Sequence, residues 1–489
     1  MERARAVASP AACGPSYLSA FPTANRRKAK GADFRDFLAK DRANPEDAPV
    51  VILMKAPLRQ LLAVLLTSLT TLVAAESTPK KPNVLLILAD DLGLECLSSY
   101  GGTSHQTPNL DRLAKEGMRF THCFANPLCS PSRAQLLTGR YPFLNGLKVV
   151  LSSKKQEDIF LRPSQPSFPR QLKQHGYATQ IVGKWHVSLE HKHDTIRDFG
   201  FDHYQTWSIF DDRGQKTTRY WNPYQLRDGR IIAEEVRKRY GPDVDLETHL
   251  DFIRKCAQDQ KPFLAFYSTY LPHYPWEPTP DSKEQGYRAP DVAHKGDAKY
   301  FPEMVAYLDR QIGAMLRTLD ELGVADDTIV IFLADNGTDV GLRHQWGDGR
   351  VIAGGKGTMT DRGTRVPLLV RWPGRIKAAG TCADLIDLSD FLPTLCALTG
   401  APLPAARIHG RSFAPQLLGQ PGQPREWVHI QNANHRQVRD REFMLNNQGE
   451  LRRVVELWED PAKPDANTDP AKEAAARKKL QAIFDELGP

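Results

Sequence analysis

Apolar runs that stop at polar or acidic residues restrict the fold of this chain more than any other feature. Residues 84–89 run into a pair of aspartates, and residues 329–334 run into the sequence Asp-Asn-Gly. Apolar runs without alternation are typical of strands buried on both faces of a sheet, and such sheets are usually parallel. Both runs therefore predict strands at the centre of a sheet that is covered by helices.

Further strands and helices alternate along the chain. Short apolar runs separated by segments of 3.6-residue periodicity are the pattern of β-α-β units. We therefore expect an α/β fold with a large mixed, mostly parallel sheet sandwiched by helices, whose ligands bind beyond the carboxyl ends of the strands. The additional strands are expected at residues 178–182, 263–267 and 366–370, and the helices at 108–116, 168–174 and 304–322.

The C-terminal part of the chain has a different pattern. A proline-rich junction lies at residues 402–404, and short strand-like runs follow it before a charged amphipathic helix. We expect a main domain over residues 80–404 and a small α+β subdomain with a short antiparallel sheet over residues 405–489. The strands of this subdomain are expected at 427–430, 442–445 and 451–458, and its helix at 471–487.

The N-terminal part has the pattern of a targeting segment. Lys55 and Arg59 precede an apolar run over residues 61–73, and small residues follow it. This pattern predicts a secretory signal peptide over residues 54–75, and hence an exported protein, periplasmic or secreted, without a stable membrane span. Residues 1–53 would then be an upstream, disordered extension. A cytosolic protein with a buried apolar helix is the alternative.

Charge and cysteine usage argue against three other classes. The formal net charge of +7 is concentrated before residue 76 and the remainder is nearly neutral, which gives no argument for a nucleic-acid partner. The seven cysteines are widely spaced and include no C-x-x-C pair. That spacing argues against a disulfide framework, although it leaves room for one or two bridges, and against a structural zinc site.

Cys129, Pro131 and Arg133 form one chemical unit. Proline suits the first turn of a helix, so the cysteine is expected at a helix N-terminus. Backbone N–H groups and the helix dipole favour an anion there, and Arg133 adds a planar positive group. The unit predicts a reactive side chain placed against a small oxyanion. The alternatives are a buried structural cysteine and a cysteine-phosphatase loop, but that loop needs an arginine where this chain has Gln135.

Four oxygen ligands follow the two central strands. Hard oxygen ligands without histidine suit Ca²⁺, and Mg²⁺ second to it, whereas Zn²⁺ prefers histidine and thiolate. An aspartate after a strand can also cap a helix, but a pair of ligands at each of two strand ends favours a metal site. The candidate metal ligands are Asp90, Asp91, Asp335 and Asn336.

Two lysines and two histidines stand at comparable places. Lys184 and His186 are two residues apart after a strand, so they lie on one side of an extended segment. His273 follows another strand, and Lys356 stands among glycines that let backbone approach a ligand. We expect these four side chains near the anion, although an isolated histidine is more often an ordinary surface or core residue.

Two segments lack any periodicity. Residues 205–245 and 274–300 are polar, proline-rich and aromatic. We expect long loops there over one rim of the sheet. Such loops in an enzyme often bind substrate, and solvated insertions are the equal alternative.

Together these motifs resemble the sulfatase family, within the alkaline-phosphatase-like superfamily. The resemblance spans about residues 82–400 and weakens after about residue 425. The sequence GKWH is followed by Val187 and Ser188, where the family usually has Leu-Gly. The matching motifs are Asp90-Asp91, residues 107–111 (TPNLD), CSPSR with LTGRYP from Cys129, GKWH from Gly183, His273, ADNG from Ala334, GGKGT from Gly354 and TRVP from Thr364.

The resemblance implies a sulfuric ester hydrolase with a modified cysteine. A maturation enzyme would convert Cys129 to formylglycine, an aldehyde whose hydrate attacks sulfur; deprotonation of the second hydroxyl then expels sulfate. The resemblance also implies a Ca²⁺ ion. Its ligands would be Asp90, Asp91, Asp335, Asn336 and the modified Cys129.

The cationic residues and histidines take roles from the same resemblance. Arg133 and Lys184 would hold the formylglycine and the sulfate. His186 would act as the base when the sulfated intermediate collapses. His273 and Lys356 would bind sulfate and assist the leaving group.

The expected substrate is a sulfated small molecule, and by default a sugar or glycan fragment. Two other hypotheses for the function remain. One is a phosphodiesterase or phosphonate monoester hydrolase on the same scaffold. The other is an inactive protein that binds sulfated glycans.

Overall fold

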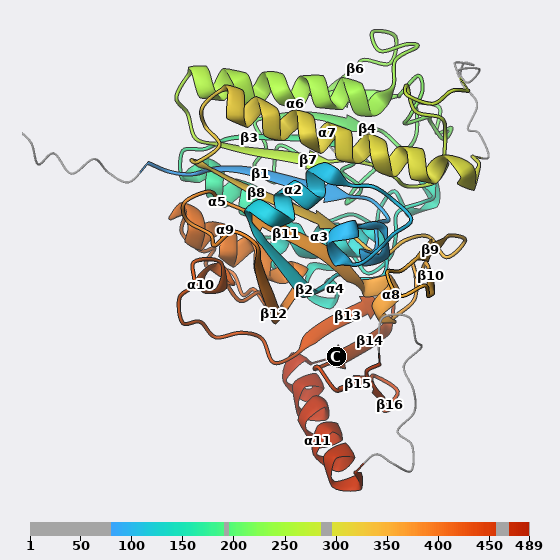
Figure 1. Ribbon diagram of the computed structural model, residues 1–489, viewed down its shortest axis with the longest axis vertical. Coiled ribbons are helices and arrows are strands. Elements are labelled where there is room, and N and C mark those ends of the chain that lie inside the picture. The colour runs from blue at the N-terminus through green and yellow to red at the C-terminus, as the bar shows by residue number, and fades with distance from the viewer. Residues whose placement is uncertain (1–79, 190–194, 285–295, 456–468, 489) are drawn as a thin grey trace, which may run out of the picture. The chain divides into compact units, whose positions relative to one another are not determined.

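The computed structural model describes residues 80–189, 195–284, 296–455 and 469–488 (Figure 1). The predicted extension over residues 1–53 and the predicted signal peptide over residues 54–75 lie outside the described residues. Everything described here belongs to one unit, residues 77–489. Among the described residues, no helix combines the length and the apolar character that crossing a bilayer requires.

A ten-stranded sheet forms the centre of the fold, in the order β12-β2-β11-β8-β1-β7-β3-β4-β5-β6. The strands from β8 to β4 are parallel, whereas β11 is antiparallel to both neighbours. The large mixed, mostly parallel sheet expected from the sequence is therefore confirmed. The strands are β1 (Asn83–Ala89), β2 (Met118–Phe124), β3 (Ala178–Gly183), β4 (His203–Trp207), β5 (Gln225–Arg227), β6 (Arg230–Ile231), β7 (Phe263–Ser268), β8 (Thr328–Ala334), β11 (Arg365–Arg371) and β12 (Gly380–Asp387).

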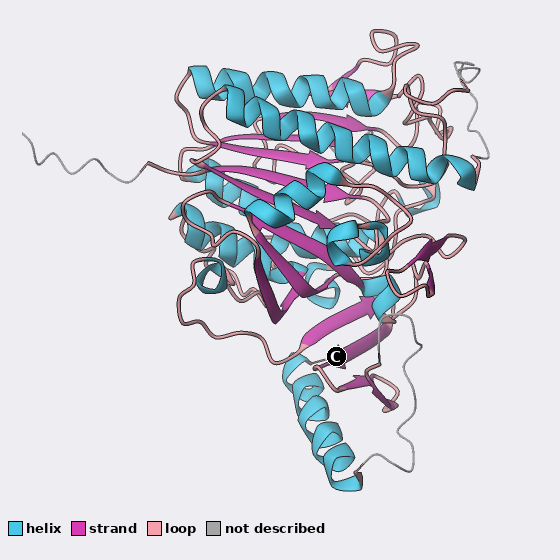
Figure 2. Ribbon diagram, viewed as in Figure 1, coloured by secondary structure: helices cyan, strands magenta, loops and turns pink. Residues whose placement is uncertain are grey.

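Helices pack around this sheet in two groups (Figure 2). In the first group α2 and α6 both contact α7, and α6 also contacts β3 and β7. In the second group α9 contacts α3, α5 and α10. The helices are α2 (Pro108–Glu116), α3 (Cys129–Thr138), α4 (Pro142–Asn145), α5 (Phe168–Gln174), α6 (Gly241–Gln258), α7 (Phe301–Glu321), α8 (Asp361–Thr364), α9 (Phe391–Thr399) and α10 (Ala414–Leu417).

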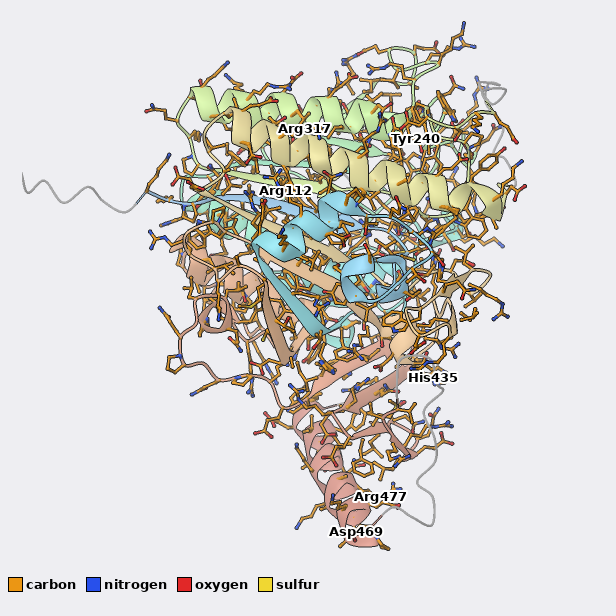
Figure 3. All side chains as sticks on the ribbon, viewed as in Figure 1. Arg112, Tyr240, Arg317, His435, Asp469 and Arg477 are labelled. Carbon is orange, nitrogen blue, oxygen red and sulfur yellow. The ribbon has the colours of Figure 1, made fainter. Side chains whose placement is uncertain are left out.

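The C-terminal segment forms the short antiparallel sheet that the sequence predicts. Its order is β13-β14-β15-β16, and α11 packs against β14 and β15. Asp469 caps α11 by accepting the N–H of Ala471, and Arg477 on the same helix donates to the carbonyl of Gly449 at 2.6 Å (Figure 3). The elements are β13 (Val428–Asn432), β14 (His435–Arg439), β15 (Phe443–Asn446), β16 (Leu451–Arg453) and α11 (Pro470–Leu487).

One detail of the sequence prediction differs from the structure. Residues 205–245 are not only loop, because β4 continues to Trp207, β5 and β6 extend the sheet edge, and α6 begins at Gly241. These edge strands have two or three residues, too few for a period to show. No disulfide joins the six cysteines that the structure describes, and Cys13 lies outside that part of the chain.

Candidate active site

The two acidic strand ends meet at the centre of the sheet. Ala89 of β1 is the register partner of Ala334 of β8, so the residues that follow them emerge side by side. Asp91 has a positive φ of 62°, which turns its backbone sharply. Its N–H donates to Asp335 Oδ1 at 3.2 Å. Parallel pairing thus places both ligand pairs at one point of the carboxyl edge, as the sequence predicts.

Cys129 lies at the N-terminus of α3, directly against this acidic cluster. The residue is the first of the helix, and its side chain is buried. Its Sγ lies 3.5 Å from Asp90 Oδ1 and 3.9 Å from Asp91 Oδ1. Burial raises the pKa of the Cys129 thiol far above its usual value, although Lys184 opposes the shift. As an unmodified thiol this residue is therefore neutral and a poor nucleophile.

Arg133 and Lys184 neutralise the inner carboxylates. Arg133 Nε donates to Asp335 Oδ2 at 2.9 Å, and Lys184 Nζ donates to Asp90 Oδ2 at 2.6 Å. Burial disfavours the charge of Asp90, yet the cations, Lys184 above all, hold its pKa well below the usual range. Arg133 also donates to Ser268 Oγ at 2.6 Å. Ser268 ends β7, and the sequence analysis did not single it out.

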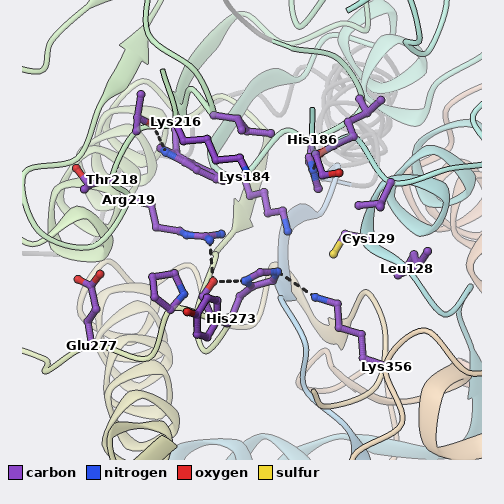
Figure 4. A pocket seen from close by; sticks show the side chains of 18 residues that line it. Leu128, Cys129, Lys184, His186, Lys216, Thr218, Arg219, His273, Glu277 and Lys356 are labelled. Carbon is purple, nitrogen blue, oxygen red and sulfur yellow. Dashed lines mark hydrogen bonds between the residues drawn. The ribbon is translucent and has the colours of Figure 1, made fainter. Parts of the chain in front are cut away.

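His273 and Lys356 approach the cluster from another side (Figure 4). The Nζ of Lys356 hydrogen-bonds to Asp91 Oδ2 and lies 3.0 Å from His273 Nε2. Burial moves the pKa of His273 well below its usual value, and Lys356 adds to that shift although Asp90 opposes it. The imidazole is therefore neutral, and it can accept a proton shared with the ammonium group.

His186 follows Lys184 with a left-handed backbone, φ 59°. Its Nε2 lies 2.6 Å from the carbonyl oxygen of Leu151, which assigns the proton to that nitrogen. Burial lowers the pKa of His186 well below its usual value, and the positive charge of Lys184 adds to the effect. A neutral ring that donates through Nε2 carries its lone pair on Nδ1, as a general base must.

The oxygen cluster fits a hard divalent cation. Asn336 Nδ2 donates to Asp91 Oδ1 at 2.8 Å, while the buried Asn336 Oδ1 has no hydrogen-bond partner in the structure. Burial and the nearby Asp90 raise the pKa of Asp335 to about 7, and burial also raises that of Asp91. Crowded carboxylates and an unpartnered carbonyl oxygen are what a cation such as Ca²⁺ would satisfy.

All ten candidate residues converge on this site, and a cavity leads outward from it. The cavity has a volume of about 570 Å³. Its inner wall includes Cys129, Lys184, His186, His273 and Lys356, all singled out in the sequence. Its outer wall includes Trp207, Lys216, Arg219, Tyr274 and Glu277, which were missed individually but belong to the two segments expected over the rim.

The outer wall is both aromatic and charged. The guanidinium of Arg219 lies 4.4 Å from the ring centroid of Trp207 and donates to the carbonyl of Tyr274 at 2.7 Å. Glu277 is buried nearby, and burial raises its pKa to about 7 although Arg219 opposes the shift. The rim therefore combines an exposed aromatic ring, Tyr274, with a guanidinium and a titratable carboxyl, which favours the hypothesis that these segments bind substrate.

Fold and site together define a class of enzyme. A residue at a helix N-terminus faces an oxygen cluster suited to a divalent ion, and the surrounding cations stabilise negative charge that develops on a bound ester. Such an arrangement at the carboxyl edge of an α/β sheet is that of a hydrolase for anionic esters.

Comparison with known proteins assigns the family. The sulfatase family model matches residues 82–401, close to the span of the resemblance. A model of the C-terminal region of N-sulphoglucosamine sulphohydrolase matches residues 345–481, which extends the likeness beyond the point where the motifs weaken. The chain therefore belongs to the sulfatase family, and it is a sulfuric ester hydrolase.

Relatives named as sulfatases agree with this assignment, and a solved structure shares the fold. The N-acetylgalactosamine-6-sulfatase of Canis lupus familiaris is 33% identical over 71% of this chain and 68% of its own length. Arylsulfatase A of Homo sapiens is 32% identical over 73% of this chain and 72% of its own length. The crystal structure of Ps i-CgsB shares the fold, with a TM-score of 0.68 and 24% identity over 83% of this chain and 92% of that one.

Proposed function

We propose that this sulfatase hydrolyses a sulfate ester on a sugar, with formylglycine derived from Cys129 and a bound Ca²⁺ ion. One observation carries the proposal. Cys129 Sγ lies 3.5 Å from Asp90, in a cluster of buried oxygen ligands that includes the unpartnered Asn336 Oδ1. When bound, these groups supply an aldehyde hydrate as nucleophile and a Lewis acid for the sulfate oxygens.

The cations of the chain lower the barrier that charge imposes. A sulfate ester carries a negative charge, which repels an anionic nucleophile. Lys184 and Arg133 already neutralise Asp90 and Asp335, so added negative charge at the bound sulfate meets a balanced site rather than three bare carboxylates. Because the residues are buried and fixed in position, they need little reorganisation during the reaction.

His186 and the Lys356–His273 pair act at different steps: His186 takes a proton, and the pair assists the leaving group. The neutral His186 ring is held by the carbonyl of Leu151, and its Nδ1 can take a proton when sulfate is released. Lys356 keeps its charge, because Asp91 raises its pKa although burial opposes that shift. We assign to Lys356 the stabilisation of the departing alkoxide, with His273 positioned against it at 3.0 Å.

A sugar is supported as the carrier of the sulfate by the cavity and by one relative. A volume of about 570 Å³ is within the range of small-molecule sites and accommodates one or two sugar rings. The outer wall presents the exposed ring of Tyr274, an aromatic group against which a sugar ring can pack. A relative named N-acetylgalactosamine-6-sulfatase matches most of this chain.

The test combines the chemical state of Cys129 with substrate turnover. The protein is produced together with a formylglycine-generating enzyme, and the peptide that carries Cys129 is measured by mass spectrometry. We expect an aldehyde at this position, and faster turnover of an aryl sulfate than of an aryl phosphodiester. Cys129→Ala should lower kcat by roughly 10⁴-fold or more without changing the melting temperature greatly. Cys256→Ala, a buried cysteine of α6, is the control.

The proposed function and the two alternatives predict different outcomes. An unmodified thiol, or activity that persists in Cys129→Ala, contradicts the proposal. Faster turnover of the phosphodiester supports a phosphodiesterase on the same scaffold. Binding of sulfated sugars without turnover supports an inactive glycan-binding protein. Desulfation of mono- and oligosaccharides in a screen then identifies the carrier.

A further inference from the structure

A second group of metal-binding side chains lies outside the catalytic cluster. Cys96, His105 and His344 come from three segments and are all buried, with exposed fractions of 1%, 8% and 3%. One ligand atom of each lies within 4.8 Å of the other two. Cys96 Sγ is 3.9 Å from His344 Nε2, and His344 Nδ1 is 3.0 Å from His105 Nε2. We name this group the Cys96 cluster.

The surroundings of the Cys96 cluster leave polar atoms without partners. The buried His105 Nδ1 has no hydrogen-bond partner. The buried Oε1 of Glu95, the residue before Cys96, has none either. The ring of Phe301 packs against both histidines, at centroid distances of 5.6 and 5.5 Å. Leaving an imidazole nitrogen and a carboxyl oxygen buried without partners is costly, and a ligand at the cluster would reduce that cost.

The protonation of the two imidazoles suits a cation, whereas burial and the Glu95 carboxyl raise the pKa of the Cys96 thiol well above its usual value, so the ion must displace the thiol proton. Burial lowers the pKa of His105 to about 4 and that of His344 to about 3, so both rings are neutral and carry lone pairs at neutral pH. Arg362 is the cation that acts on Glu95, whose pKa burial nevertheless raises.

The cluster also lies directly behind the catalytic residues. Thr338 Oγ1 accepts the N–H of Gly93 at 2.8 Å and lies 3.4 Å from Cys96 Sγ. Gly93 is two residues from Asp91, and Thr338 is two residues from Asn336. His344 lies in β9 (Arg343–Gln345), which pairs with β10 (Val351–Ala353) just before the loop that carries Lys356. A metal ion held by both Cys96 and His344 would fix these loops to one another.

We propose that Cys96, His105 and His344 form a second metal site, which binds a zinc-class divalent ion and braces the loops behind the catalytic centre. One thiolate and two imidazoles are ligands that Zn²⁺ prefers, and they differ in kind from the all-oxygen set that suits Ca²⁺. In a tetrahedral site with Zn–S and Zn–N distances of about 2.3 and 2.0 Å, ligand atoms lie roughly 3.3–3.6 Å apart. Because His344 faces Cys96 with Nε2 and His105 with Nδ1, binding the ion would require the imidazoles to rotate from these positions.

Charge balances when the ion binds. The thiol proton of Cys96 leaves to solvent, and a sulfur–metal bond replaces the S–H bond. Thiolate and the neighbouring Glu95 carboxylate together offset the two positive charges of the ion. Three protein ligands leave a fourth position for a water molecule. Sequence spacing did not reveal this site because the third ligand is 239 residues from the second.

Cobalt(II) is the probe for this site, because only a thiolate ligand produces an intense sulfur-to-cobalt charge-transfer band in the near ultraviolet. The protein carries Cys129→Ala, so that no catalytic thiol contributes, and it is saturated with Ca²⁺ first. We expect one equivalent of Co²⁺ to produce the band and Zn²⁺ to abolish it. Cys96→Ser should remove the band, and His344→Gln should weaken Co²⁺ binding at least tenfold. Cys256→Ser, the matched buried cysteine, should keep it.

The result does not depend on sulfatase activity. If Cys129→Ala protein shows no band, or if the band survives in Cys96→Ser, the proposal is wrong and the cluster is a chain of hydrogen bonds. If Cys96→Ser does not fold, Co²⁺ binding is tested in His105→Gln instead. That variant removes the ligand nearest the surface and should also weaken Co²⁺ binding. A further check is the melting temperature, which Zn²⁺ should raise in the Ca²⁺-saturated protein but not in His105→Gln.

Discussion

Single residues set the charge of the catalytic centre. The carboxylates of the inner site are paired with cations, whereas Glu277 on the outer cavity wall is not part of these pairs. Three buried carboxylates face Lys184, Lys356 and Arg133 around Cys129, so the inner site is closely compensated before any metal ion binds. Glu277 is different. It lines the outer cavity, and its buried carboxyl has a pKa of about 7. Its charge therefore changes near neutral pH.

We expect the KM for an anionic aryl sulfate to rise as pH increases through about 7. Below that pH the Glu277 carboxyl is protonated and neutral; above it, the carboxylate repels the substrate across the cavity. The increase should be roughly fivefold, which corresponds to about 1 kcal/mol of repulsion. Glu277→Gln should keep KM at its low-pH value at every pH, with kcat little changed. Steady-state kinetics from pH 5.5 to 8.5 measure this.

Glu284→Gln is the control for that experiment. Glu284 is exposed on the same segment and pairs with Lys299 instead of lining the cavity. It should leave the pH profile of KM as in the unmodified protein. An unchanged rise of KM in Glu277→Gln would assign the titration to another group.

Elements differ in how far the sequence predicts them. The strands that hold the site were predictable, because β1, β3, β7 and β8 are buried on both faces and mostly apolar, with Thr179 and Gln180 in β3 among the exceptions. The ligands at their ends were predictable for the same reason. Strands β5 and β6 were not predictable, because two or three residues are too few to show a period. Trp207 and Arg219 gave no individual signal, since tertiary contacts alone place them on the cavity wall.

The close packing of β3 against β7 positions Lys184. Gly183 ends β3 with φ 96°, and a Cβ on it would lie 2.1 Å from the carbonyl oxygen of Ser268. That same oxygen accepts the N–H of Lys184 at 2.6 Å. We expect Gly183→Ala to push the strand ends apart, to lower the free energy of unfolding by roughly 3 kcal/mol and to lower kcat/KM by roughly 10²-fold. Denaturant unfolding and steady-state kinetics measure the two effects.

Gly176→Ala separates backbone strain from close packing. Gly176 has a similar φ of 92°, but the nearest atom to its added Cβ would be Lys81 Nζ at 3.8 Å. This variant should lose only about 1 kcal/mol of stability and keep its activity. Equal losses in the two variants would show that φ alone matters and that the contact with Ser268 does not position Lys184.

At the scale of the whole molecule, a buried ion network connects the segment before the C-terminal sheet to the helix that carries Cys129. Arg425 Nε donates to Asp390 Oδ2 at 2.7 Å, and its guanidinium also donates to the hydroxyl of Tyr141 at 3.0 Å. Asp387, at the end of β12, accepts from Gln135 of α3 at 3.1 Å. Burial raises the pKa of Asp390 to about 6, although Arg425 opposes the shift.

Arg425→Met should therefore destabilise the protein in a pH-dependent way. Without the guanidinium, Asp387 and Asp390 are buried as an uncompensated pair, at a cost of about 3–5 kcal/mol near pH 8. An acid whose folded pKa lies above its unfolded value loses stability as pH rises, so the loss should shrink near pH 5, where Asp390 is protonated. Urea unfolding of Arg425→Met at pH 5 and pH 8 measures both values. Adding Asp390→Asn should recover part of the loss at pH 8, whereas exposed Arg477→Met should be nearly neutral. If Arg425→Met loses the same free energy at both pH values, the network acts through packing of the long side chain and not through its charge.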